Sequence, residues 1–113
     1  MTHLDEQFAS NAALVEQRVN MGDLADYPRR LDHMADLPRK GVDGAVAALR
    51  TAGFRVDSVK KGFRRVRVEF SREDAATLVQ ANAVTQQIVE IVDEHSGIYD
   101  GWAAFLLTEP PPE

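Results

Sequence analysis

The segment from residue 97 to residue 107, GIYDGWAAFLL, constrains the fold of this chain more than any other part of it. It holds the single Trp of the sequence, Trp102, and one of its two Tyr residues, Tyr99. Large rings in an apolar run need a packed surface to cover them, so we expect a final strand at 98–107. Tyr99 and Trp102 differ in strand parity, so one ring should face the helices and the other the open face of a sheet.

Periodicity predicts a helix at 4–20, followed by the element order βαββαβ. The later elements are, in order, strand 29–37, helix 39–52, strands 54–59 and 63–70 around a turn at 60–62, helix 74–95 and strand 98–107. Residues 71–74 (SRED) resemble a capping box that begins the last helix. The expected fold class is α+β: a ferredoxin-like βαββαβ sandwich with a four-stranded antiparallel sheet in 4-1-3-2 order, two helices on one face, and an extra N-terminal helix.

We divide the chain into an N-terminal helix and connector (1–26), the ferredoxin-like domain (27–107) and a solvated tail (108–113). The expected core is the apolar face of the two sheet-packing helices and the third strand: Val42, Val46, Leu49, Val66, Val68, Phe70, Leu78 and Ile88. The N-terminal helix has no place in a complete sandwich. Because an isolated helix of this length is marginal in water, we expect it to cover part of the open sheet face or to pack on a second copy of the chain.

The composition limits the classes of function. A chain of 113 residues is long enough for one domain with one core. It contains no Cys, which excludes disulfides and thiolate chemistry and fits a cytoplasmic location. Its first residues lack the pattern of a signal peptide, and no apolar run is long enough to span a bilayer, so we expect no membrane association.

Catalytic and metal-binding patterns are absent from the sequence. The three His residues are too dispersed for a metal site, and the sequence has no phosphate-binding Gly loop or nucleophile elbow. We expect Asp100 to be structural, holding the strand start through bonds to neighbouring backbone amides. The expected protein is therefore not an enzyme and has no cofactor.

Charge is distributed unevenly in a chain whose formal net charge is −5. Residues 55–72 carry seven Lys or Arg against two acids, whereas residues 73–113 carry eight acids and no Lys or Arg. The basic run 60–67 (KKGFRRVR) has two interpretations, a solvated hairpin face or a surface that binds nucleic acid. Arg residues on the open face of the sheet could instead pair with carboxylates of a protein partner.

Residues 28–107 resemble the RraB family, the regulators of ribonuclease E activity of type B. The specific match is the GIYDGW sequence at 97–102, which is similar to the Tyr-Asp-Gly-Trp signature of the family. Weaker matches in the same order are RLDH at 30–33, ALRTAGFRV at 48–56 and the long helix after 70–72.

The resemblance implies a small regulator that binds the scaffold region of ribonuclease E and lowers its RNA-cleaving activity. Characterised members have a long acidic C-terminal tail and an acidic middle hairpin, whereas this chain has a short tail and a basic hairpin. We expect a protein partner, with nucleic-acid binding through hairpin 60–67 as the alternative and a homodimer as a further option. The predicted partner-binding residues are Arg55, Arg65, Arg67, Tyr99, Asp100 and Trp102.

Overall fold

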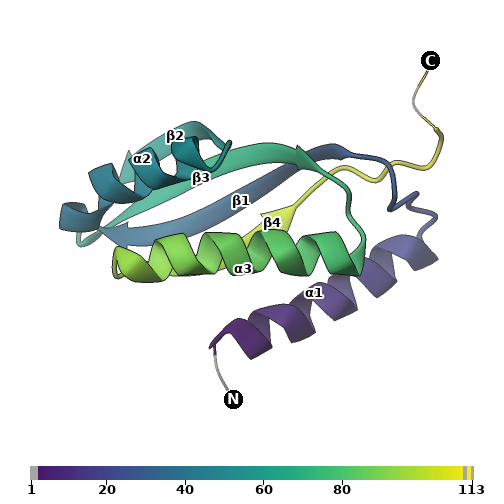
Figure 1. Ribbon diagram of the computed structural model, residues 1–113, viewed down its shortest axis with the longest axis horizontal. Helices are drawn as coiled ribbons and strands as arrows, with labels where there is room; N and C mark the ends of the chain where they lie inside the picture. Colours follow the sequence, from purple (N-terminus) through teal and green to yellow (C-terminus); the bar gives the residue numbers. More distant parts are fainter. Residues whose placement is uncertain (1–2, 111, 113) are drawn as a thin grey trace.

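The computed structural model describes residues 3–110 and residue 112, and it consists of a helical layer packed on one antiparallel sheet (Figure 1). The elements in chain order are α1 (His3–Asn20), β1 (Arg29–Pro38), the 3-10 turn η1 (Arg39–Gly41), α2 (Val42–Thr51), β2 (Arg55–Lys61), β3 (Arg65–Asp74), α3 (Leu78–Glu94) and β4 (Ile98–Ala103). The strand order is β2-β3-β1-β4. This order and the antiparallel pairing confirm the expected α+β, ferredoxin-like sandwich.

Side chains alternate between the two faces along the central strands, and those on one face form the core between the sheet and the helices. Of the expected core residues, six are buried and Val46 is partly buried; the six are Val42, Leu49, Val66, Val68, Phe70 and Ile88. Leu78 is 39 % exposed, so its assignment to the core is wrong. It is the first residue of α3, and the buried face of that helix begins at Ala81.

The start of α3 also differs from the prediction. Residues 71–74 do not cap a helix, because they continue β3, whose pairing with β1 runs on to the Arg29–Asp74 pair. The helix begins after Thr77, whose hydroxyl accepts a hydrogen bond from the amide of Gln80. A continuous ladder of backbone hydrogen bonds to β1 therefore outweighs the local capping pattern.

The last strand is shorter than expected, since β4 ends at Ala103 rather than at residue 107. Side chains from other parts of the chain bind the backbone that follows it. The guanidinium of Arg18 donates to the carbonyl oxygens of Ala104 and Phe105, and the amide of Leu107 donates to Asp23. These bonds hold the segment after β4 in place without a strand partner.

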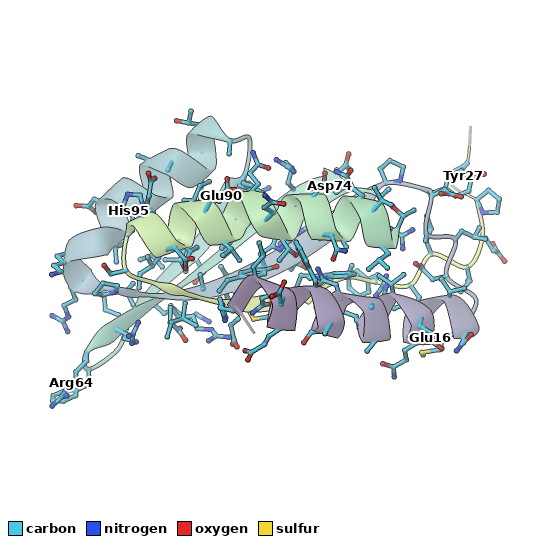
Figure 2. The ribbon with its side chains drawn as sticks, turned by 60° about the horizontal axis from the view of Figure 1, so that its bottom comes forward. Glu16, Tyr27, Arg64, Asp74, Glu90 and His95 are labelled. Atoms are coloured by element: carbon cyan, nitrogen blue, oxygen red, sulfur yellow. The ribbon has the colours of Figure 1, made fainter. Side chains whose placement is uncertain are left out.

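Helix α1 packs beside α3, so the three helices lie side by side on the same face of the sheet (Figure 2). Leu14 and Val15 pack against a small apolar cluster that includes Trp102. The expectation that α1 lies on the open face or on a second copy is wrong, because α1 packs on α3 and on the helix-facing side of β4 within the same chain. Among residues 3–110 and 112, no helix covers the open face of the sheet.

Candidate partner-binding surface

The open face of the sheet carries the alternate residues of each strand that point away from the helices. Register places Arg67 opposite Asp36 of β1 and Lys60 of β2, on the face opposite the buried Val66 and Val68. Most side chains on this open face are charged: Arg30, Asp32, Asp36, Arg55, Asp57, Lys60, Arg65, Arg67, Glu69, Glu73 and Asp100. The structure thus brings together four of the six predicted partner-binding residues.

Arg67 lies at the centre of a charge-paired group on this face. Its Nη2 is 2.7 Å from Oδ2 of Asp100, and its Nη1 is 3.2 Å from Oδ1 of Asp36. The hydrogen bond to Asp100, together with that to Asp36, raises the pKa of Arg67 above its usual value. Asp100 therefore binds Arg67 instead of the backbone amides that we expected it to contact.

Arg30 and Arg55 are paired in the same way. Nε of Arg30 is 2.7 Å from Oδ1 of Asp32, and Nε of Arg55 is 3.1 Å from Oδ1 of Asp57. A hollow of about 320 Å³ lies over this part of the face and is lined by Arg30, Asp32, His33, Met34, Asp57, Glu69, Phe70 and Ala103. Arg30, Arg55 and Arg67 are thus each paired with carboxylates of the open face.

Tyr99 and Trp102 lie on the opposite side of the sheet, where they are 1 % and 7 % exposed. Pairing of β4 with β1 shifts register between the His33–Trp102 and Ala35–Tyr99 pairs, so β4 holds an extra residue there. Gly101 in this bulge has a φ of +102°, a conformation that glycine adopts readily. The extra residue turns both rings toward the helices, so the expectation of opposite faces is wrong.

A buried polar network surrounds the two rings and connects α1 to the sheet. Nε1 of Trp102 donates to Oδ1 of Asn11, at 2.9 Å, and Nδ2 of Asn11 donates to the hydroxyl of Thr85 on α3, also at 2.9 Å. The hydroxyl of Tyr99 lies 2.7 Å from Nδ1 of His33. These contacts satisfy polar groups that burial would otherwise penalise.

His33 is the most deeply buried titratable base in this network. Burial lowers its pKa to about 4 and raises the pKa of Tyr99, so both side chains are neutral at pH 7. The ring of His33 stacks on Phe70 at 5.4 Å and meets Phe54 edge-on at 5.7 Å. His33 is 1 % exposed and packs among these aromatic rings, so it forms part of the core of the domain.

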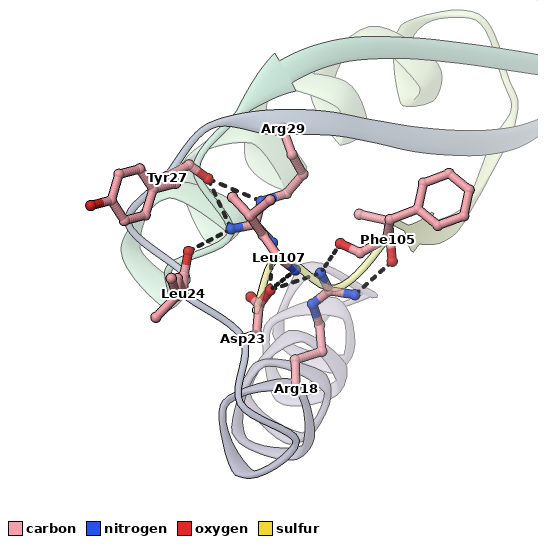
Figure 3. Close-up of polar contacts among 8 residues, drawn as sticks. Arg18, Asp23, Leu24, Tyr27, Arg29, Phe105 and Leu107 are labelled. Atoms are coloured by element: carbon pink, nitrogen blue, oxygen red, sulfur yellow. Dashed lines mark hydrogen bonds and ion pairs between the residues drawn. The ribbon is translucent and has the colours of Figure 1, made fainter. Parts of the chain in front are cut away.

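A second buried cluster, which the sequence analysis missed, joins α1, the connector and the segment after β4 (Figure 3). Asp23 accepts a 2.6 Å hydrogen bond from Arg29 and lies 3.6 Å from Arg18, whose guanidinium is 5.5 Å from the ring centre of Trp102. Burial acts to raise the pKa of Asp23, but the bonds from the Leu107 amide and from Arg29 bring it below its usual value.

One sequence pattern could have revealed both clusters. Asn11 and Arg18 lie on the same side of α1 as the partly buried Leu14 and Val15, and both are buried. A polar residue on an apolar helical stripe requires a hydrogen-bonding partner from elsewhere in the chain. The partners themselves come from segments far away in sequence, so the stripe alone does not identify them.

The β2–β3 hairpin projects at the end of the molecule where Arg64 is labelled in Figure 2. Phe63 in its turn is 89 % exposed, and the neighbouring Arg64 guanidinium lies 5.6 Å from its ring centre. Within residues 3–110 and 112, no group of His, Asp or Glu side chains is arranged to hold a metal ion. None of the described helices has the length and apolar character needed to cross a membrane.

The chain is similar to a known protein family. A family model described as RraB, Regulator of ribonuclease activity B, matches residues 8–103. The matched region contains all four strands, α2, α3 and most of α1, including the buried network around Trp102. No curated protein matches the chain.

Proposed function

This chain belongs to the RraB family, and we propose that it is a non-enzymatic protein that binds a ribonuclease E-type enzyme and lowers its RNA-cleaving activity. The observation that carries the proposal is the match of a family described as a regulator of ribonuclease activity to residues 8–103. A regulator that acts by binding needs an accessible surface and a stable scaffold, and it needs no reacting groups of its own. Its proposed location is the cytoplasm, together with the RNA that the enzyme cleaves.

The proposed contact surface is the open sheet face. Arg55, Arg65, Arg67 and Asp100 would touch the partner directly. Exposed ion pairs such as Arg67–Asp100 contribute only about 0–1 kcal/mol, so carboxylates and guanidinium groups of a partner can replace the intramolecular ones at small cost. Tyr99 and Trp102 are buried, and in this proposal they support the strand that presents Asp100.

The test is a cleavage assay with the purified ribonuclease E-type enzyme of the same host and a fluorogenic RNA substrate. We expect the cleavage rate to fall as the full chain is added, and calorimetry to detect a complex of micromolar affinity or tighter. The variant Arg65→Glu/Arg67→Glu should inhibit less, whereas Arg50→Glu, an exposed change on α2, should inhibit normally. An unchanged cleavage rate with no detectable complex would refute the proposal.

Nucleic-acid binding is the alternative function, and the exposed Phe63 and Arg64 in a basic hairpin are the observations in its favour. Single-stranded RNA would be titrated at about 50 and about 200 mM salt, because phosphate contacts make such binding steeply salt-dependent. Micromolar, salt-sensitive binding that Arg65→Ala/Arg67→Ala abolishes would favour this alternative.

A second copy of the chain is the remaining candidate partner. Light scattering across a range of protein concentrations would distinguish a monomer from a homodimer. A dimer that the Arg65→Glu/Arg67→Glu variant dissociates would assign the open face to self-association instead of ribonuclease binding.

A further inference from the structure

Five basic side chains gather around the turn of the β2–β3 hairpin. We call these residues, together with Phe63, the basic tip: Arg39, Lys60, Lys61, Phe63, Arg64 and Arg65. Arg39 belongs to this group because its Nη2 donates to the carbonyl oxygen of Gly62 at 3.1 Å. Pairing of Pro38 with Arg65 places the start of η1 beside the base of the hairpin.

The positive charge of the basic tip is largely uncompensated. Among residues 3–110 and 112, the only ion pair that involves the tip joins Lys60 to Glu69, at 3.9 Å. On the open face, by contrast, Arg67 contacts two carboxylates and Arg55 contacts one. The positive potential that an anionic partner would meet is therefore concentrated at the tip, which includes the hairpin end of the open face at Lys60 and Arg65, and not around the paired Arg55 and Arg67.

Phe63 adds an apolar anchor to this charge. A single exposed aromatic ring is unremarkable on a protein surface. Here the ring is 89 % exposed and flanked by the Arg64 guanidinium, at the end of a projecting hairpin. Aromatic and Arg side chains are enriched among the residues that dominate binding energy at protein interfaces.

We propose that the basic tip docks onto an acidic segment of the protein partner, with Phe63 packing on an apolar side chain of that segment. This inference rests on the proposed function, because it names the part of this chain that first engages the ribonuclease. Carboxylates of the segment would pair with Arg64 and Arg65, and the unpaired charge would raise the rate of association.

The surroundings of the tip favour a short acidic protein segment over RNA. The C-terminal part of α3 lies at the same end of the molecule (Figure 2), and its residues Glu90, Asp93 and Glu94 line a broad surface hollow. The whole chain is also acidic, with a formal net charge of −5. A long polyanion that extended beyond the tip would meet these carboxylates, whereas a short segment can end before it reaches them.

The experiment uses the full chain and three probes: the purified ribonuclease E-type enzyme, a labelled peptide of alternating Glu and Leu, and a mixed-sequence single-stranded RNA of equal charge. The tip variant is Phe63→Ala/Arg64→Glu. The matched control, Arg50→Glu/Val79→Ala, also reverses one exposed Arg and truncates one exposed apolar side chain, since Val79 is 82 % exposed. Circular dichroism would verify that both variants fold.

We expect the tip variant to bind the ribonuclease and the acidic peptide about tenfold more weakly than the control, with most of the loss in the association rate at low salt. Equal binding of the peptide by both variants would overturn the docking proposal, even if the ribonuclease still binds elsewhere on the chain. Tighter binding of RNA than of peptide through the tip would also overturn it. Tip-dependent peptide binding without any ribonuclease binding would support the acidic-segment chemistry and refute the proposed function.

Discussion

The two edges of the sheet differ in what lies beside them. At one edge, β4 is short and bulged, and α1 approaches it closely enough for the Gln7 side-chain amide to donate to the carbonyl oxygen of Tyr99. At the other edge, β2 continues into a projecting hairpin whose turn carries unpaired basic residues. Bulges, short strands, covering elements and Lys side chains all protect sheet edges from pairing with other chains.

The contrast separates the edge of this small domain that stabilises the fold from the edge whose side chains are accessible to a partner. The β4 edge holds a buried network that joins α1, α3 and β1 through Asn11, Thr85, Tyr99, His33 and Trp102. The β2 edge ends in side chains that are largely exposed to solvent. Substitutions at the first edge should therefore change folding, and substitutions at the second should change binding.

The largest expected effect is that of Trp102→Ala. Removing the indole creates a cavity, leaves the Asn11 carbonyl oxygen without its donor and removes the contact with Arg18, so the free energy of unfolding should fall by about 3–5 kcal/mol. Urea unfolding followed by circular dichroism measures this change. Phe105→Ala is the control, because Phe105 is 90 % exposed and should change stability by less than about 0.5 kcal/mol. Similar losses of stability in both variants would contradict the proposed difference between the two edges.

The next effect is a loss of stability on acidification that depends on His33. Its folded-state pKa is about 4 against 6.5 for the unfolded residue, so the unfolded chain takes up the proton first as pH falls. Stability should decline between about pH 6.5 and pH 4 by about 3 kcal/mol from this residue.

The matched measurement compares the wild type with His33→Phe by urea unfolding at several pH values. Both proteins share the same carboxylates, so the difference between their pH profiles isolates the contribution of His33. We expect the variant to lack the decline above pH 4 that this residue causes. Parallel profiles for the two proteins would show that His33 is not buried as a neutral side chain.

Asn11→Ala should have an intermediate effect. The substitution leaves the Trp102 Nε1–H without its acceptor and removes the donor to Thr85, at a cost of about 1–3 kcal/mol. Hydrogen exchange should accelerate in α1 more than in β3, because the network attaches this helix to the rest of the fold. Ser10→Ala, an exposed change in the same helix, should leave the exchange of α1 unchanged.

Phe63→Ala should have the smallest effect on stability, below about 0.5 kcal/mol, because the ring is almost fully exposed. Thermal unfolding of the wild type and the variant would test this. The same variant should bind the partner more weakly, so a large change in folding with unchanged binding would reverse the assignment of the two edges.

Local patterns predicted the strands well where alternation is regular and poorly where long-range pairing intervenes. The parity rule fails at Tyr99 and Trp102 because a bulge at Gly101 inserts one residue, and nothing in the alternation of apolar residues marks the insertion. Similarly, residues 71–74 have the local pattern of a helix cap but pair with β1 along a ten-residue ladder. In both cases, pairing with β1 determines the local backbone structure.

The candidate surface was likewise predicted in part, with local placement correct and long-range contacts missed. Sequence alternation correctly placed Arg55, Arg65 and Arg67 on the open face. It did not show that Asp36 and Asp100 compensate Arg67, because those two carboxylates come from other strands. Asp57, which pairs with Arg55, lies two residues away on the same strand. Whether these residues bind a partner stays a prediction. The structure shows that Arg55 and Arg67 are paired with carboxylates, whereas Arg65, which also belongs to the basic tip, forms no ion pair with the described residues.

Sequence patterns are sufficient to predict the element order, the antiparallel sheet with β1 and β3 at its centre, and the core beneath α2 and α3. These features follow from the periodicity of apolar residues within short segments, which acts locally. The position of α1 and the direction of the Trp102 ring become clear only in the folded chain. Those outcomes depend on hydrogen bonds between residues as distant as Asn11 and Trp102, and a buried polar group is stable only where the fold brings its partner within reach.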